Sequence, residues 1–301
     1  MKKIVVIQPA GLRDAQLAKL RELGEVTYYD TVVKDVDEWL ERVTGADIIY
    51  TNIQGFEEGW RSLRNVFVTL PFVGVGFLDP AVLKQNNVVV SRSPGCNRIA
   101  VSEWIVGMLL NYARQLPKLT NATSLDRPGP YYTTSLFGKT ACIMGKGHIG
   151  SRTGELLTAF GMKVACYTRN DDLAAKVKDA DFIIDCLSLN PSTVNFYNKQ
   201  FFEKTKDGVV FVTVTSKKMM DMQVILDHLA TGKIGHFISD NAQGMLFDID
   251  DPDYRALVDN PNVTITPHVS AYSDNTQETA ARMCVENIKA YLAGKPINLV
   301  S

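Results

Sequence analysis

The chain is poor in the residues that build metal centres and disulfide frameworks. It has four histidines and five cysteines in 301 residues. None of them forms a CxxC pair, an HxxxH spacing or a mixed Cys/His cluster, so the sequence predicts no metal site and no disulfide scaffold. Three of the cysteines lie inside strand-like apolar runs, which indicates buried thiols in a reducing compartment. We therefore expect a cytoplasmic protein without a metal.

Long apolar runs and an excess of charge of one sign are also missing. No apolar stretch approaches the roughly 20 residues that cross a bilayer, and the opening MKKIVVIQPAG has an apolar run too short for a signal peptide. The formal net charge of -1 gives no global reason to expect nucleic acid or an anionic membrane as a partner. We therefore expect a globular protein whose partner is a small molecule.

The sequence does contain an alternation of short β-rich runs with helix-length segments. Candidate strands lie at 3–7, 26–29, 47–50, 66–69, 88–90, 140–144, 163–167, 181–187, 209–214, 236–239 and 263–266. Candidate helices include 12–23, 98–116, 149–160, 221–231 and 273–293. Such alternation is typical of α/β proteins with parallel sheets and crossover helices. The chain length suggests about two domains.

The segment 98–116, RIAVSEWIVGMLLNYARQL, is apolar on nearly all sides and predicts a buried helix. We place a domain boundary just before it. The last helix is isolated from the second sheet, so we expect it to return to the first domain. The predicted division is 1–98 plus 272–301 for one domain and 99–271 for the other.

The strongest motif is GKGHIG at residues 145–150, which follows a strand and opens an amphipathic helix. Its glycines allow a tight turn, close approach of a pyrophosphate and close packing of helix on strand, while the helix N-terminus offers free N–H groups to phosphates. The sequence therefore predicts a dinucleotide site. Its residues are Gly145, Gly147, His148, Ile149 and Gly150, with His148 acting mainly through its backbone.

The end of the following strand bears on the choice of cofactor. An acidic residue there usually bonds the ribose 2′-OH of NAD, but this strand ends in Thr168-Arg169-Asn170. A hydroxyl followed by a guanidinium suits a 2′-phosphate, which favours NADP over NAD. The alternative is that Arg169 is a solvated loop residue and that Asp171 reaches back.

Four segments, in order, resemble one enzyme family. They are VGVGFLDPAVLKQNNVVVSRSPGCNRIAVSEW at 73–104, the glycine motif, DFIIDCLSLNPSTVNFYN at 181–198 and NVTITPHVSAYS at 262–273. Together they resemble the D-isomer-specific 2-hydroxyacid dehydrogenases, which include glycerate, phosphoglycerate, D-lactate and formate dehydrogenases. The resemblance implies two Rossmann-like, doubly wound parallel-sheet domains, the first for substrate and the second for dinucleotide. It also implies hydride transfer between nicotinamide and a carbonyl or hydroxyl group, in a homodimer.

The resemblance also assigns residues to the site. His268 would be the catalytic acid/base, Asp240 would bond the nicotinamide amide, and the backbone of Val75 and Gly76 would bind substrate. The remaining cofactor contacts would come from Leu187, Ser188, Thr193 and Thr215.

Two catalytic residues of the family are replaced in this sequence. Ser216 stands where the family has the arginine that clamps a 2-keto acid, and Lys217 follows it. A lysine is a point charge and cannot make the two-pronged clamp, so Lys217 is either an active-site cation or a solvated turn residue. The catalytic glutamate falls at or near Met245, and Gln243 is the nearest polar candidate.

These replacements leave two functions open. The first is a reductase whose substrate departs from simple 2-keto acids, such as a carbonyl or imine without a free carboxylate. The second is a dinucleotide-binding sensor or scaffold that has lost the reaction. The retained His268 and Asp240 favour the enzyme.

Overall fold

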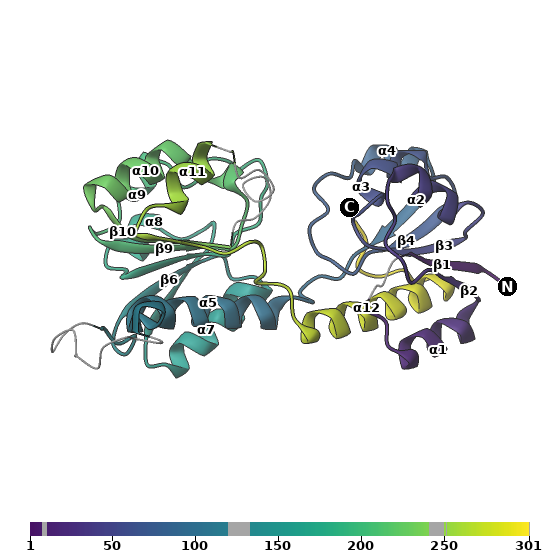
Figure 1. Cartoon of the computed structure of the whole chain (residues 1–301), viewed down its shortest axis with the longest axis horizontal. Helices are drawn as coiled ribbons and strands as arrows, with labels where there is room; N and C mark the ends of the chain where they lie inside the picture. Colours follow the sequence, from purple (N-terminus) through teal and green to yellow (C-terminus); the bar gives the residue numbers. More distant parts are fainter. Residues whose placement is uncertain (8–10, 120–132, 241–249, 251, 301) are drawn as a thin grey trace. The chain divides into compact units, whose positions relative to one another are not determined.

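The chain folds into two compact α/β units. The structure is a computed structural model that describes residues 1–7, 11–119, 133–240, 250 and 252–300. The first unit joins Met1–Asn97 to Tyr272–Ser301, and the second is Arg98–Ala271 (Figure 1). No helix in the described parts of the chain is long and apolar enough to cross a membrane.

The first unit is built on a parallel sheet with the strand order β2-β1-β3-β4-β5. Its strands are β1 Lys3–Ile7, β2 Glu25–Tyr28, β3 Ile48–Thr51, β4 Val66–Thr69 and β5 Val88–Ser91. Its helices are α1 Asp14–Leu23, α2 Val36–Val43, α3 Phe56–Gly59, the 3-10 turn η1 Trp60–Ser62, α4 Pro80–Gln85 and α12 Asp274–Leu292. The central strands are buried along their whole length, as in sheets covered on both faces.

The C-terminal helix α12 completes this first unit. Cys284 and Ile288 are fully buried against the sheet, and the ring of Tyr291 stacks on Phe67 with 4.2 Å between centroids. The buried Asn287 donates through its amide nitrogen to the Thr69 hydroxyl at 3.2 Å. Helix and sheet thus share one core although they lie at opposite ends of the sequence.

The second unit is built on a parallel sheet with the order β11-β10-β9-β8-β6-β7. Its strands are β6 Thr140–Met144, β7 Lys163–Tyr167, β8 Phe182–Asp185, β9 Val209–Thr213, β10 Ile234–Ser239 and β11 Val263–Ile265. Its helices are α5 Arg98–Arg114, α6 Leu116–Leu119, α7 His148–Ala159, α8 Leu173–Val177, α9 Lys199–Phe202, the 3-10 turn η2 Lys217–Met219, α10 Met222–Thr231 and α11 Pro252–Val258.

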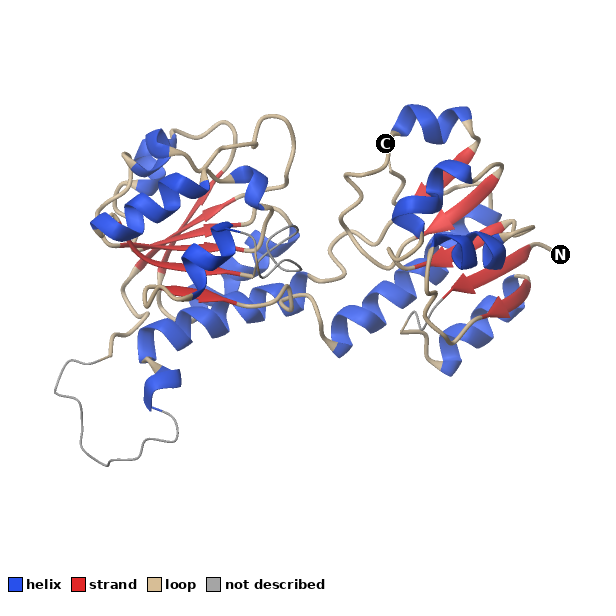
Figure 2. Cartoon of the chain, turned by 45° about the horizontal axis from the view of Figure 1, so that its top comes forward, coloured by secondary structure: helices blue, strands red, loops and turns tan. Residues whose placement is uncertain are grey.

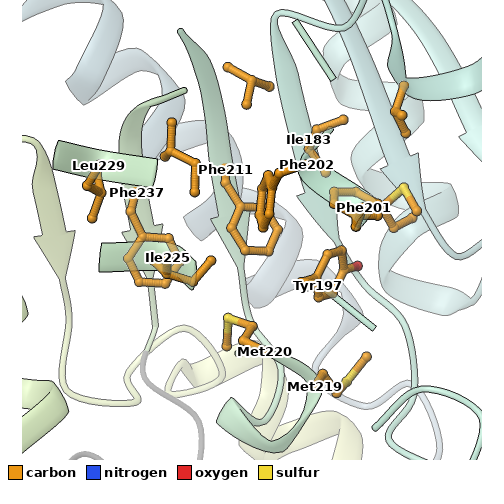
Figure 3. Close-up of a cluster of buried hydrophobic side chains, with 14 of the residues drawn as sticks. Ile183, Tyr197, Phe201, Phe202, Phe211, Met219, Met220, Ile225, Leu229 and Phe237 are labelled. Atoms are coloured by element: carbon orange, nitrogen blue, oxygen red, sulfur yellow. The ribbon is translucent and has the colours of Figure 1, made fainter. Parts of the chain in front are cut away.

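Helices cover both faces of this second sheet (Figure 2). One face packs on α5 and α7 through an aliphatic cluster that includes Leu109 and Leu157. The other face carries an aromatic cluster in which Phe211 meets Tyr197 and Phe202, together with Ile225 and Leu229 of α10 (Figure 3). Because both faces are buried, β8 and β9 are continuous buried runs rather than alternating ones.

The doubly wound α/β architecture predicted from the sequence is confirmed. Every run predicted as a strand is a strand, with ends that differ by at most two residues. Helix α5 differs from its prediction, because it is not buried all round. Ile105 and Leu109 face the core, whereas Glu103 is exposed to solvent and needs no buried partner.

Candidate active site

The glycine motif forms a tight turn between β6 and α7. Gly145 has a φ of 99°, which favours glycine, and its N–H donates to the Tyr167 carbonyl at 3.0 Å. A Cβ on Gly150 would lie 2.0 Å from the Gly145 carbonyl oxygen, so only glycine lets the helix come this close to the strand. A Cβ on Gly147 would meet no atom within 4 Å. The helix N-terminus is therefore open at Gly147, as a pyrophosphate site requires.

The first helical residues also lie as the motif predicts. His148 begins α7, and its side chain is exposed. Ile149 is half-buried and packs against the aliphatic cluster that includes Leu109 and Leu157. The side chain of His148 makes no hydrogen bond within the described residues, so its N-terminal position on the helix is its clearest contribution. These features together fit a dinucleotide phosphate.

After β7, the carboxylate of Asp171 folds back onto Thr168 within the same turn. It accepts hydrogen bonds from the Thr168 N–H at 2.7 Å and the Thr168 hydroxyl at 2.6 Å. Lys176 lies 3.3 Å from the other carboxylate oxygen. The Thr168 bonds, with help from Lys176, hold the pKa of Asp171 below its usual range. Arg169 is exposed and has no partner in the described part of the chain.

The loop after β8 is held by its own hydrogen bonds. The Thr193 hydroxyl donates to the Ser188 carbonyl at 2.8 Å, and the Asn190 amide nitrogen donates to the same carbonyl at 2.9 Å. Thr193 is 8% exposed, so its hydroxyl is committed to the loop rather than open to a ligand. Ser188 is exposed, and the Leu187 N–H donates to Asp185 at 3.1 Å.

After β9, Ser216 begins a turn that also contains Lys217 and Lys218. The Ser216 hydroxyl caps η2 by accepting from the Lys218 N–H at 3.3 Å. The Lys217 ammonium lies 3.8 Å from the Asp253 carboxylate on α11. Lys217 and Lys218 both line a shallow groove with Asp253. Lys217 is thus placed beside Asp253, a carboxylate of the same unit. Thr215 directly precedes Ser216, the residue that caps η2.

Asp240 organises the segment that carries His268. Its carboxylate is 2% exposed and accepts from the Thr266 hydroxyl at 2.5 Å, the Val269 N–H at 2.9 Å and the Ser270 N–H at 2.8 Å. His268 lies inside this loop with a φ of 50°, a left-handed conformation that is uncommon outside glycine. The resemblance assigns Asp240 to the nicotinamide amide. Within the described residues, its carboxylate bonds this loop and its backbone N–H donates to the Thr213 carbonyl at 3.1 Å.

No arginine in the described part of the second unit hydrogen-bonds or ion-pairs with Ser216 or His268. Arg152 and Arg255 each pair with a nearby carboxylate. The others are exposed, namely Arg98, Arg114 and Arg169. Within the described part of the second unit, no other arginine therefore takes the place of the one that the family has at the Ser216 position.

The predicted substrate residues belong to the first unit. Val75 is half-buried, and its carbonyl accepts from the Leu78 N–H at 3.0 Å. Gly76 is exposed, and a Cβ there would meet no atom within 4 Å. The Arg92 guanidinium steadies this loop by donating to the Val73 carbonyl at 3.1 Å.

Gln243 and the position of the family's glutamate, near Met245, lie outside the described residues. Among the residues that the structure describes, no group of three or more His, Cys, Asp or Glu side chains could hold a metal ion.

Sequence reasoning missed Asp185, the last residue of β8. Its side chain is fully buried, and burial raises the pKa of this carboxyl despite four hydrogen bonds to it. The available signal was a charged residue inside the apolar run FIIDCL, because a buried charge needs partners.

The geometry of the second unit is that of a nucleotide-binding domain, and comparison with known proteins agrees. The model for "D-isomer specific 2-hydroxyacid dehydrogenase, NAD binding domain" matches residues 106–270. The chain belongs to this family. It is therefore an oxidoreductase that transfers hydride between a nicotinamide dinucleotide and a CH–OH or carbonyl group, as the sequence predicted. The comparisons give no support to the alternative of a sensor or scaffold.

The individual relatives have low sequence identity to this chain but align over most of its length. The chain is 27% identical to the hydroxypyruvate reductase of Blautia hydrogenotrophica, over 99% of both chains. It is 26% identical to the D-3-phosphoglycerate dehydrogenase of Methanocaldococcus jannaschii, where it spans 58% of that enzyme. A solved acyclic imino acid reductase in complex with NADPH and D-Arg has the same fold, with a TM-score of 0.85, 22% identity and coverage of 99% and 100%.

Proposed function

We propose that the protein is an NADPH-dependent reductase of a carbonyl or imine substrate, with His268 as the proton donor. The observation that carries the proposal is the buried Asp240 carboxylate, whose three hydrogen bonds hold the loop of His268. A left-handed backbone at a non-glycine residue costs about 1–3 kcal/mol and persists where its surroundings over-determine it, commonly at active sites. Asp240 supplies that constraint.

The residues divide the chemistry among them. When bound, the dinucleotide supplies the hydride. Hydride addition builds negative charge on the substrate oxygen or nitrogen, and a proton from the His268 imidazole would neutralise it. Gly147 and the N-terminus of α7 would hold the pyrophosphate, while Leu187, Ser188 and Thr215 would contact the rest of the cofactor.

The substrate class follows from Ser216. A hydroxyl that caps η2 cannot grip a carboxylate with two parallel hydrogen bonds as a guanidinium does. We therefore infer that the substrate is a carbonyl or imine whose recognition does not depend on a carboxylate next to the reacting carbon. Backbone groups at Val75 and Gly76 would bind its polar atoms.

Turnover by the purified protein tests this substrate class. NADPH oxidation would be followed with three groups of substrates. They are the 2-keto acids glyoxylate, pyruvate and hydroxypyruvate, ketones that lack an acid group, and imines formed from an amine and a carbonyl compound. We expect the largest kcat/KM outside the simple 2-keto acids. The variant Ser216→Arg should raise kcat/KM for pyruvate about tenfold or more, because it restores the clamp, whereas Ser216→Lys should not. Robust turnover of simple 2-keto acids by the unaltered protein would contradict the inference.

The preference for NADP rests on two side chains. Asp171 is engaged by Thr168 and Lys176, so a ribose 2′-OH would have to share its carboxylate with these partners. Arg169 is exposed and has no carboxylate partner in the described residues, so its guanidinium is available for a 2′-phosphate.

Cofactor kinetics test the preference for NADP. We expect Arg169→Ala to lower kcat/KM for NADPH about tenfold and to leave that for NADH unchanged, because a charge-assisted phosphate contact is lost. The control is Arg255→Ala, which removes an exposed guanidinium elsewhere in the same unit. Equal effects of Arg169→Ala on both cofactors would contradict the assignment.

The assembly and location stay proposals from the family resemblance. We propose a cytoplasmic homodimer that pairs through the second unit. Light scattering of the purified protein measures the assembly, and a mass near 33.4 kDa, that of one chain, would contradict it.

A further inference from the structure

The buried carboxylate of Asp185 gathers hydrogen bonds from three separate segments. One oxygen accepts from the Leu187 N–H at 3.1 Å and the Tyr197 hydroxyl at 2.6 Å. The other accepts from the Thr213 hydroxyl at 2.9 Å and, by a short hydrogen bond, from the Thr215 hydroxyl. These donors belong to the end of β8, the stretch before α9 and the end of β9. One side chain therefore ties the carboxyl ends of two adjacent strands together.

The location gives this network its significance. Strand β8 lies between β6, which leads into the glycine motif, and β9, which leads into Ser216. Ligands of doubly wound sheets bind outside the carboxyl ends of the strands. Two of the four donors, Leu187 and Thr215, are residues to which the proposed function assigns cofactor contacts.

We propose that Asp185 is a positioning residue, which fixes Thr215 and the turn through Ser216 so that the bound dinucleotide and the substrate are held in register. This rests on the proposed function for the roles of Thr215 and Ser216. Asp185 itself lies below the surface, 0% exposed, and acts through Thr215 and the Leu187 N–H. The network Asp185–Thr215 is thus a device for orientation rather than a contact with the reacting atoms.

The energetics of this carboxylate argue for a role in the site. Burial raises the pKa of Asp185, which means that desolvation outweighs all four hydrogen bonds to the charged form. A buried charge in this condition does not favour folding, and an uncharged group of the same shape is commonly neutral or stabilising. The presence of such a charge therefore points to a role in organising the sheet edge.

Asparagine is the informative substitution at this position. Three of the four donors are hydroxyls, which can turn round and accept from an amide nitrogen, so Asp185→Asn keeps every hydrogen bond possible. The Leu187 N–H still meets an oxygen if the amide nitrogen faces Thr213 and Thr215. The variant therefore removes the charge and loosens Thr215 without leaving a buried group unpaired.

The experiment compares Asp185→Asn and Thr215→Val with a matched control. Thr205 is another buried threonine of this unit, 5% exposed, whose hydroxyl donates to the Phe202 carbonyl at 2.9 Å, and it has no role in the site. NADPH affinity is measured by calorimetry, turnover by NADPH oxidation and stability by Tm.

We expect Asp185→Asn and Thr215→Val each to weaken NADPH binding and kcat about tenfold, with Tm unchanged or higher for Asp185→Asn. Thr215→Ser should restore most of the loss, and Thr205→Val should change Tm alone. The double variant Asp185→Asn/Thr215→Val should be no worse than either single one, because both act on one contact.

A variant Asp185→Asn that lowers Tm but leaves NADPH affinity and kcat unchanged would overturn the inference, and so would additive effects in the double variant. The affinity measurement separates this from the proposed function. If no carbonyl or imine is reduced yet Asp185→Asn and Thr215→Val weaken NADPH binding together, the positioning role stands and the proposed substrate class fails.

Discussion

The two aspartates that bracket β8 have opposite electrostatic fates. Asp181 precedes the strand, where burial opposes its charge but an ion pair with Lys206 and a 2.7 Å hydrogen bond from the Thr140 N–H outweigh it and lower its pKa. Asp185 closes the same strand, and burial raises its pKa although four donors surround it. The amino end of the strand compensates its charge with a lysine, whereas the carboxyl end does not.

This difference follows the direction of the sheet. Strand carboxyl ends form the ligand edge of a doubly wound fold. There the carboxylates of Asp185 and Asp240 are buried, and within the described residues their hydrogen-bond donors are hydroxyl and backbone N–H groups rather than cations. At the opposite edge, Asp181 has an ordinary stabilising pair. We therefore expect changes at the carboxyl edge to affect activity and changes at the amino edge to affect stability alone.

The largest expected effect is at His268. Asparagine tolerates the left-handed conformation seen there, so His268→Asn keeps the loop while removing the acid/base. We expect kcat to fall by about 10²–10⁴-fold with Tm unchanged. Steady-state kinetics and a thermal melt measure both quantities, and a variant that retains more than a tenth of its activity would remove His268 from the chemistry.

The next largest expected effect is a loss of stability at Asp240, which we compare with Asp185, the other buried carboxylate at the carboxyl ends of the strands. Asp240 accepts two backbone N–H groups, one on each oxygen, so the amide of Asp240→Asn must face an N–H that cannot turn round. We expect this variant to lose about 2–3 kcal/mol of unfolding free energy, because a buried donor is left unpaired. Asp185→Asn should stay within about 1 kcal/mol, because its other partners are hydroxyls.

Urea denaturation of the two variants measures this difference. The slope with urea should be the same for both, so that the midpoints report stability. Equal losses at both positions would break the distinction between hydroxyl and backbone donors.

The smallest effect is at the amino edge. Asp181→Asn should lower the unfolding free energy by about 1 kcal/mol at pH 7 and leave kcat unchanged, because it removes a partly exposed ion pair far along the strand from the site. The folded pKa of Asp181 is depressed, so its contribution is present above the ordinary value of about 3.9 and is lost as the pH falls through the lower folded value.

Melts of Asp181→Asn between about pH 7 and pH 3 should therefore show the difference from the unaltered protein closing as the pH falls. The exposed pair of Lys178 and Asp179, at 4.0 Å, supplies a control, since Asp179→Asn should change nothing measurable. A difference that grows on acidification would have the wrong sign for a depressed pKa.

The sequence predicted the central strands well because they are buried on both faces. Runs such as VVFVT and TACIM are continuous and β-branched or apolar, and they are bounded by clear helix or loop signals. Short helices such as α3 and α9, of four residues each, were not predicted, because one turn does not establish a 3.6-residue period.

The candidate site was only partly accessible to sequence reasoning. The glycine motif specifies its own local geometry, so its turn followed from the residues. The partner of Lys217 did not, because Asp253 lies on another helix and nothing local links the two. Asp185 was missed for the same reason, since its donors come from Thr213, Thr215 and Tyr197 and are brought together only by the fold.

The place of α12 in the first unit has a consequence for the order in which the two units fold during synthesis. The second unit is one uninterrupted segment, Arg98–Ala271, and can close as soon as it leaves the ribosome. The first unit must wait for α12, which seals the side of the sheet where Ile4 and Phe67 lie. Until α12 has been synthesised, the strands of the first unit leave apolar side chains exposed to solvent. Such transiently exposed apolar surface is prone to aggregation, which chaperones prevent.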